Sequence, residues 1–155
     1  MPINDTKLIP IEPLSVDGHQ YFYEFAEYGV PHSEYWKTPR ILNIIESVYF
    51  DREDSLINSK EQWFKNLDSA LTDDDSYMLY HFVNRELTFV AVGNIVPTLH
   101  YGYILQYYLL AGDSRHTPKS YRAMKYLAGE ILGQRVMCRS RWVKPYTYEI
   151  KFVEL

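Results

Sequence analysis

Residues 77–92 read YMLYHFVNRELTFVAV, and this stretch decides the fold class. Its two halves, 77–83 and 86–92, are rich in aromatic and β-branched side chains, which favour strands, and only Asn84 and Arg85 separate them. Two such runs joined by two residues predict an antiparallel hairpin. An aromatic run at 99–110, LHYGYILQYYLL, predicts a third strand, in which Gly102 indicates a bulge or the close approach of another backbone.

Apolar residues at helical spacing flank these strands on both sides. We predict three helices. The first follows Thr38 as its N-cap, and the second begins at Ser59, which forms a capping box with Gln62. The third follows Ser120 as its cap and stops at Gly133.

Two further strands are predicted in the tail, with a turn at Lys144-Pro145. In the last strand, one face carries alternating apolar residues that we expect to face the core: Tyr146, Tyr148, Ile150 and Phe152. By the same alternation, Cys138 is expected to be an inert core thiol. The fold class is therefore α/β (α+β), with three helices against a mostly antiparallel sheet.

The first 37 residues contain four prolines and predict an irregular N-terminal arm (1–37) before a domain at 38–155. Within the arm, residues 20–27 (QYFYEFAE) predict either a short edge strand or one helical turn.

The composition narrows the function classes. The chain has 155 residues. Its formal net charge of −4 gives no basic field that would hold nucleic acid. Its single cysteine excludes an internal disulfide. No apolar run is long enough for a membrane span, and the start lacks a signal pattern, so an intracellular compartment is expected. Aromatic residues make up 16% of the chain, which fits either a sheet-rich domain or a protein packed against other chains.

The predicted order of elements over 38–155, together with the tail SYRAMKYLAGEILGQRVMCRSRWVKPYTYEIKFVEL (120–155), resembles the Gcn5-related N-acetyltransferase superfamily. Within it, the chain is most similar to the small acetyltransferase-like proteins of tailed bacteriophages. The resemblance implies that the loop after the long strand and the start of the next helix face the pyrophosphate of acetyl-coenzyme A.

Candidate cofactor-binding residues at that loop are Arg115, Lys119 and Ser120. A helix N-terminus favours an anion, but the loop lacks the glycines of the family signature, and Pro118 removes one backbone donor. The alternative interpretation is an ordinary strand-to-helix turn. The family also usually has a helix between the two strands of the tail, and here there is no room for one.

Two further residues are candidate catalytic groups under the resemblance. Glu86 is a candidate general base and Tyr146, or Tyr148 in its place, a candidate general acid. Their plainer interpretations are a solvated carboxylate at a strand start and core-facing tyrosines. The histidines lack metal-ligand spacing, so no metal site is expected, although His81 and His100 are expected on adjacent strands.

Three arginines of the first tail strand, Arg135, Arg139 and Arg141, form a basic stripe. It fits an acidic partner, a phosphate or the solvated face of an edge strand, and we do not expect nucleic acid to be the partner.

Taken together, these features favour a bacteriophage virion structural or accessory protein that packs against other phage or host proteins, or against copies of itself. We expect a non-catalytic acetyltransferase-like fold without a cofactor, in the virion or the host cytoplasm and not in a membrane. The alternative is an acetyl-coenzyme A-dependent N-acyltransferase, and a further alternative is an inhibitor that binds a host protein.

Overall fold

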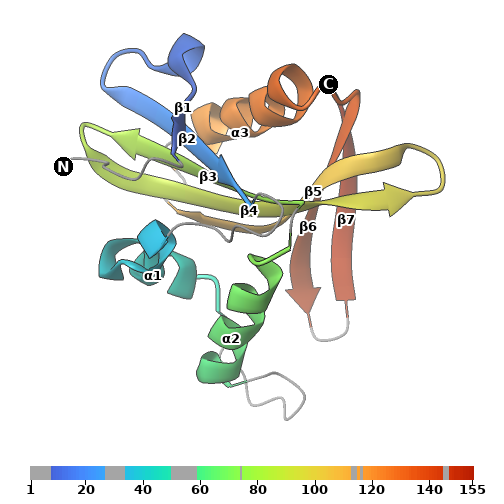
Figure 1. The fold of residues 1–155 in the computed structure, drawn as a ribbon, viewed down its shortest axis with the longest axis horizontal. Helices are drawn as coiled ribbons and strands as arrows, with labels where there is room; N and C mark the ends of the chain where they lie inside the picture. The colour runs from blue at the N-terminus through green and yellow to red at the C-terminus, as the bar shows by residue number, and fades with distance from the viewer. Residues whose placement is uncertain are drawn as a thin grey trace.

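The structure is a computed structural model that describes residues 8–26, 34–49, 59–73, 75–112, 115, 117–144 and 147–155. It is an α+β fold in which helices cover both faces of one seven-stranded sheet (Figure 1). The strands are β1 (Ile9–Pro10), β2 (His19–Phe25), β3 (Ser76–Val83), β4 (Glu86–Thr98), β5 (Gly102–Gly112), β6 (Val136–Lys144) and β7 (Thr147–Glu154). They lie side by side in chain order, and all neighbours are antiparallel except β5 and β6, which are parallel.

The helices form two layers around this sheet. On one face lie α1 (Pro39–Glu46) and α2 (Lys60–Ala70), and on the other lies α3 (Thr117–Tyr126), which continues into a π-helical turn, η4 (Leu127–Ile131) (Figure 1). Two short 3-10 helices, η1 (Glu12–Leu14) and η2 (Glu34–Lys37), complete the order. Among the helices of these ranges, none has the length and apolarity needed to cross a bilayer.

Each face of the sheet has its own hydrophobic core. The core under α1 and α2 joins helix residues to β3 and β4, and includes Trp36, Ile41, Ile45, Leu67, Met78, Tyr80, Val90 and Val92. The core under α3 joins that helix to β3, β5 and β6, and includes Leu79, Leu105, Tyr107, Met124, Leu127, Ala128 and Met137.

The predicted β3–β4 hairpin is confirmed, with a two-residue turn at Asn84 and Arg85. Both turn residues have positive φ, 49° and 71°, as in the type I′ turn whose twist matches that of paired strands. The strand at 99–110 is confirmed only from Gly102 onward, because residues 99–101 form the turn between β4 and β5.

The bulge expected at Gly102 lies elsewhere. Gly102 has a φ of +72° at the start of β5, and a Cβ there would meet nothing within 4 Å. The irregularity is between Val92 and Gly93 of β4, which pair with Leu109 and Tyr107, so that Tyr108 of β5 is the extra residue. The close backbone approach is also at Gly93, where a Cβ would lie 2.7 Å from the carbonyl oxygen of Gln106.

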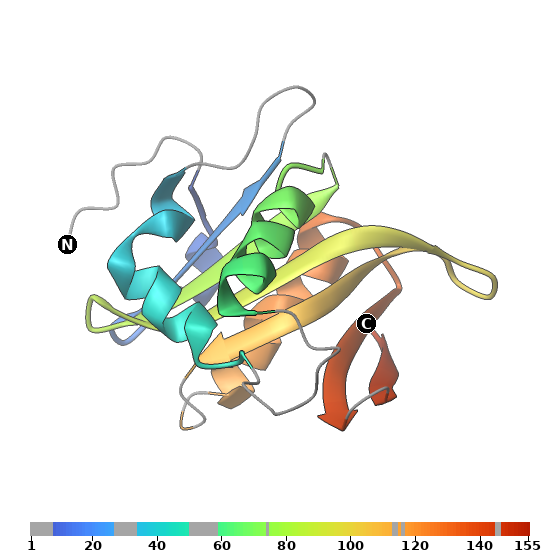
Figure 2. The same cartoon turned by 90° about the horizontal axis from the view of Figure 1, so that it is seen from below.

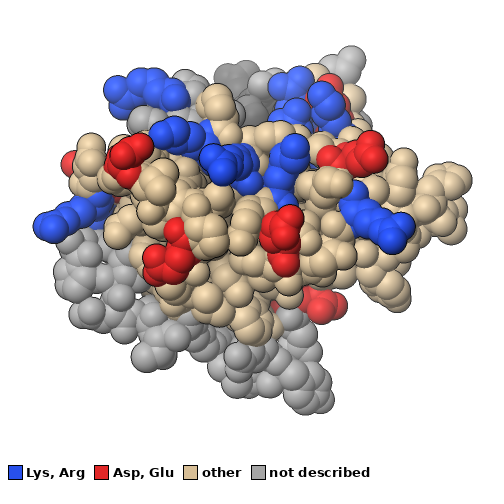
Figure 3. Space-filling model, turned by 90° about the horizontal axis from the view of Figure 1, so that it is seen from above, with Lys and Arg blue, Asp and Glu red and all other residues tan. Residues whose placement is uncertain are grey.

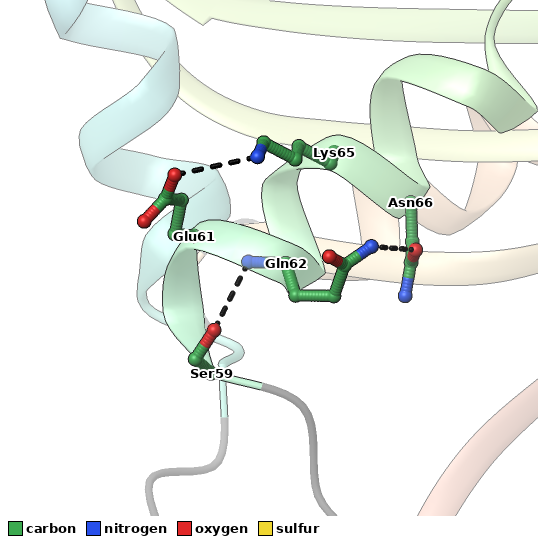
Figure 4. Close-up of polar contacts among 5 residues, drawn as sticks. All are labelled: Ser59, Glu61, Gln62, Lys65 and Asn66. Carbon is green, nitrogen blue, oxygen red and sulfur yellow. Dashed lines mark hydrogen bonds and ion pairs between the residues drawn. The ribbon is translucent and has the colours of Figure 1, made fainter.

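The helix starts agree with the sequence in part. The helix α1 follows Thr38, whose side chain makes no capping hydrogen bond. The hydroxyl of Ser59 accepts a hydrogen bond from the Gln62 N–H at 3.2 Å, as predicted, but the Gln62 side chain donates to Asn66 instead of reaching back to Ser59 (Figure 4). A Glu61–Lys65 ion pair on the same turn adds to the helix surface (Figure 4).

The third helix begins earlier than predicted, at Thr117, so Ser120 lies within its first turn and is not its N-cap. The physical reason is that Pro118 fits the first turn of a helix, where its missing N–H costs nothing. The predicted stop at Gly133 agrees with the structure, in which Gly133 has a φ of +69° just beyond η4.

Residues 8–26 differ from the irregular arm expected for 1–37. The strand β2 pairs with β3 along its whole length, so the strand interpretation is confirmed for residues 20–25 and the helical-turn interpretation is wrong. Ile11, Leu14 and Tyr21 belong to the core under α3. Prolines restrict only their own and the preceding residue, and Pro10 and Pro13 lie outside β2.

The two tail strands form as predicted and are separated by two residues, which is too few for a helix. Their burial is different: Tyr148, Ile150 and Phe152 are 67%, 54% and 45% exposed, so the core-facing prediction is wrong for these three. The reason is that β7 is the last strand of the sheet, and α1 and α2 do not extend over it (Figure 2). Tyr146 lies outside the described residues.

Candidate functional site

A chain of buried polar side chains connects β2, β3 and α3. The Nδ1 atom of His19 lies 2.9 Å from Nε2 of His81, and Nδ1 of His81 lies 2.8 Å from the Ser120 hydroxyl. We call these three residues the histidine chain. His81 and Ser120 are fully buried and His19 is almost so. Buried polar groups need such partners, because an unpaired one costs free energy.

The sheet register explains why these residues meet. His81 lies two residues after the buried Leu79 and therefore on the same, α3-facing side of β3. Its backbone partner on β2 is Tyr21. The Tyr21 ring stacks on the His81 ring, with centroids 4.2 Å apart and planes 19° apart. The first turn of α3 then brings Ser120 over His81.

The outer end of the histidine chain borders a shallow pocket of about 60 Å³. Its lining comes from the N-terminal segment and from α3: Leu14, Val16, His19, Tyr21, Lys119 and Arg122. Lys119, Arg122 and Lys125 are exposed on α3, and the α3 side of the molecule carries a band of Lys and Arg side chains (Figure 3). Burial raises the pKa of Tyr21, and the nearby Arg122 charge partly offsets this rise.

This geometry limits the chemistry of the histidine chain. Only 1% of Ser120 is exposed, so its hydroxyl cannot reach a substrate as a nucleophile. The pocket is several times smaller than the roughly 300–1,000 Å³ typical of small-molecule sites. The pocket has room for a water molecule or a small anion. The hydrogen bonds of the histidine chain connect two strands and a helix.

The residues predicted to bind a cofactor differ in their exposure. Arg115 and Lys119 are exposed, whereas Ser120 is buried against His81. Three residues of the predicted loop, Asp113, Ser114 and His116, lie outside the described residues.

The catalytic candidates are placed as follows. Glu86 is exposed at the start of β4, beside the hairpin turn, where its backbone partner is Val83. Tyr146 belongs to the part of the chain that is not described. Tyr148 is exposed on β7.

The parallel strands β5 and β6 are joined over a short distance. Their register consists of two pairs, Gln106 with Cys138 and Tyr107 with Arg139. From Tyr108 onward, β5 has no register partner among the described residues of β6. The strands therefore separate next to the bulge.

Two adjacent tyrosines at this point face opposite sides of the sheet, and Tyr107 is fully buried whereas Tyr108 is partly buried. The hydroxyl of Tyr107 donates to the carbonyl of Met124 at 2.8 Å. The hydroxyl of Tyr108 is buried and has no hydrogen-bond partner in the described part of the chain. Its burial, with the nearby Asp73 charge, raises the pKa of Tyr108 to about 12.

Two other predictions, for His100 and Cys138, have a clear outcome. His100 is exposed in the β4–β5 turn, so the prediction that His81 and His100 lie on adjacent strands is wrong; the strand that was to carry His100 begins at Gly102. Cys138 is buried, as predicted, and burial raises the pKa of its thiol. The described ranges contain no group of three or more His, Cys, Asp or Glu residues that could hold a metal ion.

The basic stripe on β6 is partly engaged within the chain. The Arg139 guanidinium lies 5.2 Å from the centre of the Tyr121 ring. The Arg141 side chain forms an exposed ion pair with Glu149 at 3.2 Å.

A patch of exposed large side chains extends from the β4–β5 turn to β7. We call it the aromatic surface, and it consists of Tyr101, Tyr148, Ile150 and Phe152. Tyr103 is 74% exposed but is not part of this surface, because it lies two residues before Leu105 and therefore on the α3 face of the sheet. The Tyr101 and Phe152 rings contact each other with centroids 5.0 Å apart, which joins the turn to β7.

Neither the histidine chain nor the aromatic surface was predicted from the sequence. His19 fell within the expected arm, and its alternation with Tyr21 along β2 was the one signal that could have placed it on a strand. The apolar alternation of β7 was recognised, but its face was assigned to the core.

No protein-family model matches the chain, and no curated protein matches its sequence.

Proposed function

We propose that this chain is a non-catalytic, protein-binding component built on an acetyltransferase-like scaffold, and that it acts by packing its aromatic surface against another protein chain. Its proposed setting is a bacteriophage particle, as a structural or accessory protein, which rests on the resemblance of the sequence. The order of elements, with α3 connecting the parallel strands β5 and β6, is compatible with such a scaffold.

The aromatic surface is the observation that carries this proposal. Its four members are between 45% and 67% exposed, and β7, which carries three of them, lies beyond the cover of α1 and α2 (Figure 2). Contiguous exposed apolar patches mark interaction sites more often than scattered single residues do. Tyrosine and phenylalanine are also enriched in the cores of protein interfaces.

The burial of Ser120 supports the absence of a cofactor contact at this residue. A hydroxyl that binds His81 inside the protein is not directed at a ligand outside it. The pocket beside it is also too small for a nucleotide.

Incorporation into particles tests the binding role. Phage particles carrying Tyr148→Ser together with Ile150→Ser should contain much less of the chain than wild-type particles. The matched control is Val16→Ser, which removes an equally exposed apolar side chain (58%) near η1, outside the aromatic surface. Equal incorporation of all three chains contradicts the binding role.

A second candidate function is acetyl-coenzyme A-dependent N-acyl transfer, and the separation of β5 from β6 favours it. The main-chain groups of β5 from Tyr108 onward have no register partner on β6 in the described chain, and such donors can hold a carbonyl oxygen. In that case an amine would attack the thioester beside this strand.

Isothermal titration with acetyl-coenzyme A separates the two functions. The non-catalytic proposal expects no heat of binding. Micromolar binding that is lost in Lys119→Glu, but kept in the matched α2 variant Lys65→Glu, would establish the acyltransferase and overturn the first proposal. Both lysines are exposed, so neither change affects a core.

A further inference from the structure

We propose that β7 pairs with β7 of a second copy of this chain, antiparallel about a two-fold axis at Ile150, so that the two sheets become continuous. This inference rests on the proposed function, because it identifies the occupant of the aromatic surface as the chain itself.

The free edge of the sheet makes such pairing feasible. The strand β7 is the last in the sheet order, and in the described chain its one strand partner is β6. Its outer edge therefore presents unpaired backbone donors and acceptors, which template the addition of another strand. A symmetric pairing over 147–153 would extend for roughly 24 Å at about 3.4 Å per residue.

The sequence of β7 is self-complementary about Ile150. In an antiparallel pair centred there, Glu149 faces Lys151 of the second copy, and Lys151 faces its Glu149. On the other face, Tyr148 faces Phe152 of the second copy. Opposite charges and aromatic pairs directly across two strands are stabilising, and here each occurs twice by symmetry.

The charges on β6 give an independent reason to expect Glu149 of a second copy beside Lys151. In the β6–β7 register, Lys151 lies opposite Arg139, which places two positive charges together. Glu149 lies opposite Arg141 and is paired with it. The Glu149 carboxylate of a second copy would lie beside Lys151 and offset the repulsion from Arg139. A second copy of this chain necessarily carries a carboxylate opposite Lys151, whereas an unrelated partner need not.

The β4–β5 turn extends the contact beyond the strands. Tyr101 already contacts Phe152. In the symmetric pair, Tyr148 of the second copy lies opposite Phe152 and adds a third ring to this group. Two such groups, one on each side of the axis, would bury much of the aromatic surface, as an isologous interface does.

Charge reversal at the two ionic positions tests the pairing and its register. Glu149→Lys places lysines at both positions 149 and 151, and Lys151→Glu places glutamates at both. By sedimentation velocity over a concentration series, wild type should dimerise, and each variant alone should dimerise about tenfold more weakly or worse. An equimolar mixture of the two variants should recover the dimer, because each strand again faces opposite charges.

The matched controls are Glu61→Lys and Lys65→Glu on α2, which make the same charge changes and break an equally exposed ion pair. Both should dimerise like wild type. Circular dichroism checks that every chain is folded, and Ile150→Lys, which places two lysines at the axis, is the replacement if either reversal fails to fold.

A wild-type chain that remains monomeric overturns the inference. Variants that dimerise as well as wild type, or that fail to associate when mixed, overturn the register. Neither result affects the interpretation of the particle-incorporation test. If that test fails, the proposed binding role itself is contradicted.

Discussion

Replacing Tyr108 with phenylalanine should stabilise the protein, and more so as the pH rises. Tyr108 is the extra residue of the β5 bulge, and its buried hydroxyl has no hydrogen-bond partner in the described chain. Tyr108→Phe keeps the ring and removes only this oxygen. An unsatisfied buried polar group costs about 1–3 kcal/mol, so the free energy of unfolding near pH 8 should rise by up to that amount.

The pH dependence follows from the tyrosine pKa. In the folded protein the pKa of Tyr108 is raised from 10.0 to about 12, whereas in the unfolded chain it returns to its ordinary value. The folded state therefore favours the neutral hydroxyl. Its contribution to stability is fully present below pH 10 and is lost as the pH rises through 12. At one pKa unit per 1.36 kcal/mol, wild type should lose about 1.4 kcal/mol through Tyr108 by pH 11.

Urea unfolding at pH 8 and at pH 11 measures this effect. Other tyrosines and the lysines also titrate in this range, but they are common to both proteins, so the difference between wild type and variant isolates Tyr108. The stabilisation by Tyr108→Phe should be about 1.4 kcal/mol larger at pH 11 than at pH 8. An equal difference at the two pH values would refute the reasoning.

Three further substitutions test the histidine chain, the bulge and the hairpin turn. Ser120→Ala removes the hydrogen bond to His81 and should lower the free energy of unfolding by about 1 kcal/mol in urea titrations; an unchanged midpoint would contradict it. Gly93→Ala places a Cβ 2.7 Å from a backbone oxygen of β5 and should cost about 1–3 kcal/mol, measured in the same way. Arg85→Gly relieves a positive φ of 71° and should raise the melting temperature by about 2–4 °C, for a gain of about 1 kcal/mol. A lower melting temperature would argue against the turn geometry.

Local signals predicted the central hairpin because strand propensity and turn length act over neighbouring residues. The runs on either side of Asn84 and Arg85 form β3 and β4 in the predicted pairing. The Ser59 cap is local in the same way, since donor and acceptor are three residues apart. Such features depend little on the rest of the chain.

The strand ends were less predictable because pairing overrides composition. The second strand of the hairpin was predicted to end at residue 92, yet β4 continues through Gly93 and Pro97 to Thr98. The partner strand β5 runs beside this segment and pairs with it. A partner supplied from elsewhere in the fold is not visible in a window of a few residues.

The candidate sites were missed for two different physical reasons. The histidine chain joins residues 62 and 39 positions apart, so no spacing in the sequence reveals it. The aromatic surface was visible as alternation in β7, but alternation shows only that one face is apolar. Whether that face is covered depends on where α1 and α2 end.

The brief junction between β5 and β6 also divides the sheet mechanically. Two register pairs, supported by a hydrogen bond from the Leu105 N–H to Gln134, connect the β6–β7 ribbon to the other strands. Amide protons of β6 should consequently exchange with solvent sooner than those of β3 and β4, which are paired on both sides. The backbone ladder is narrowest at this seam, so the attachment of the outer ribbon depends mainly on side chains, such as Met137 in the core under α3 and the Tyr101–Phe152 ring pair.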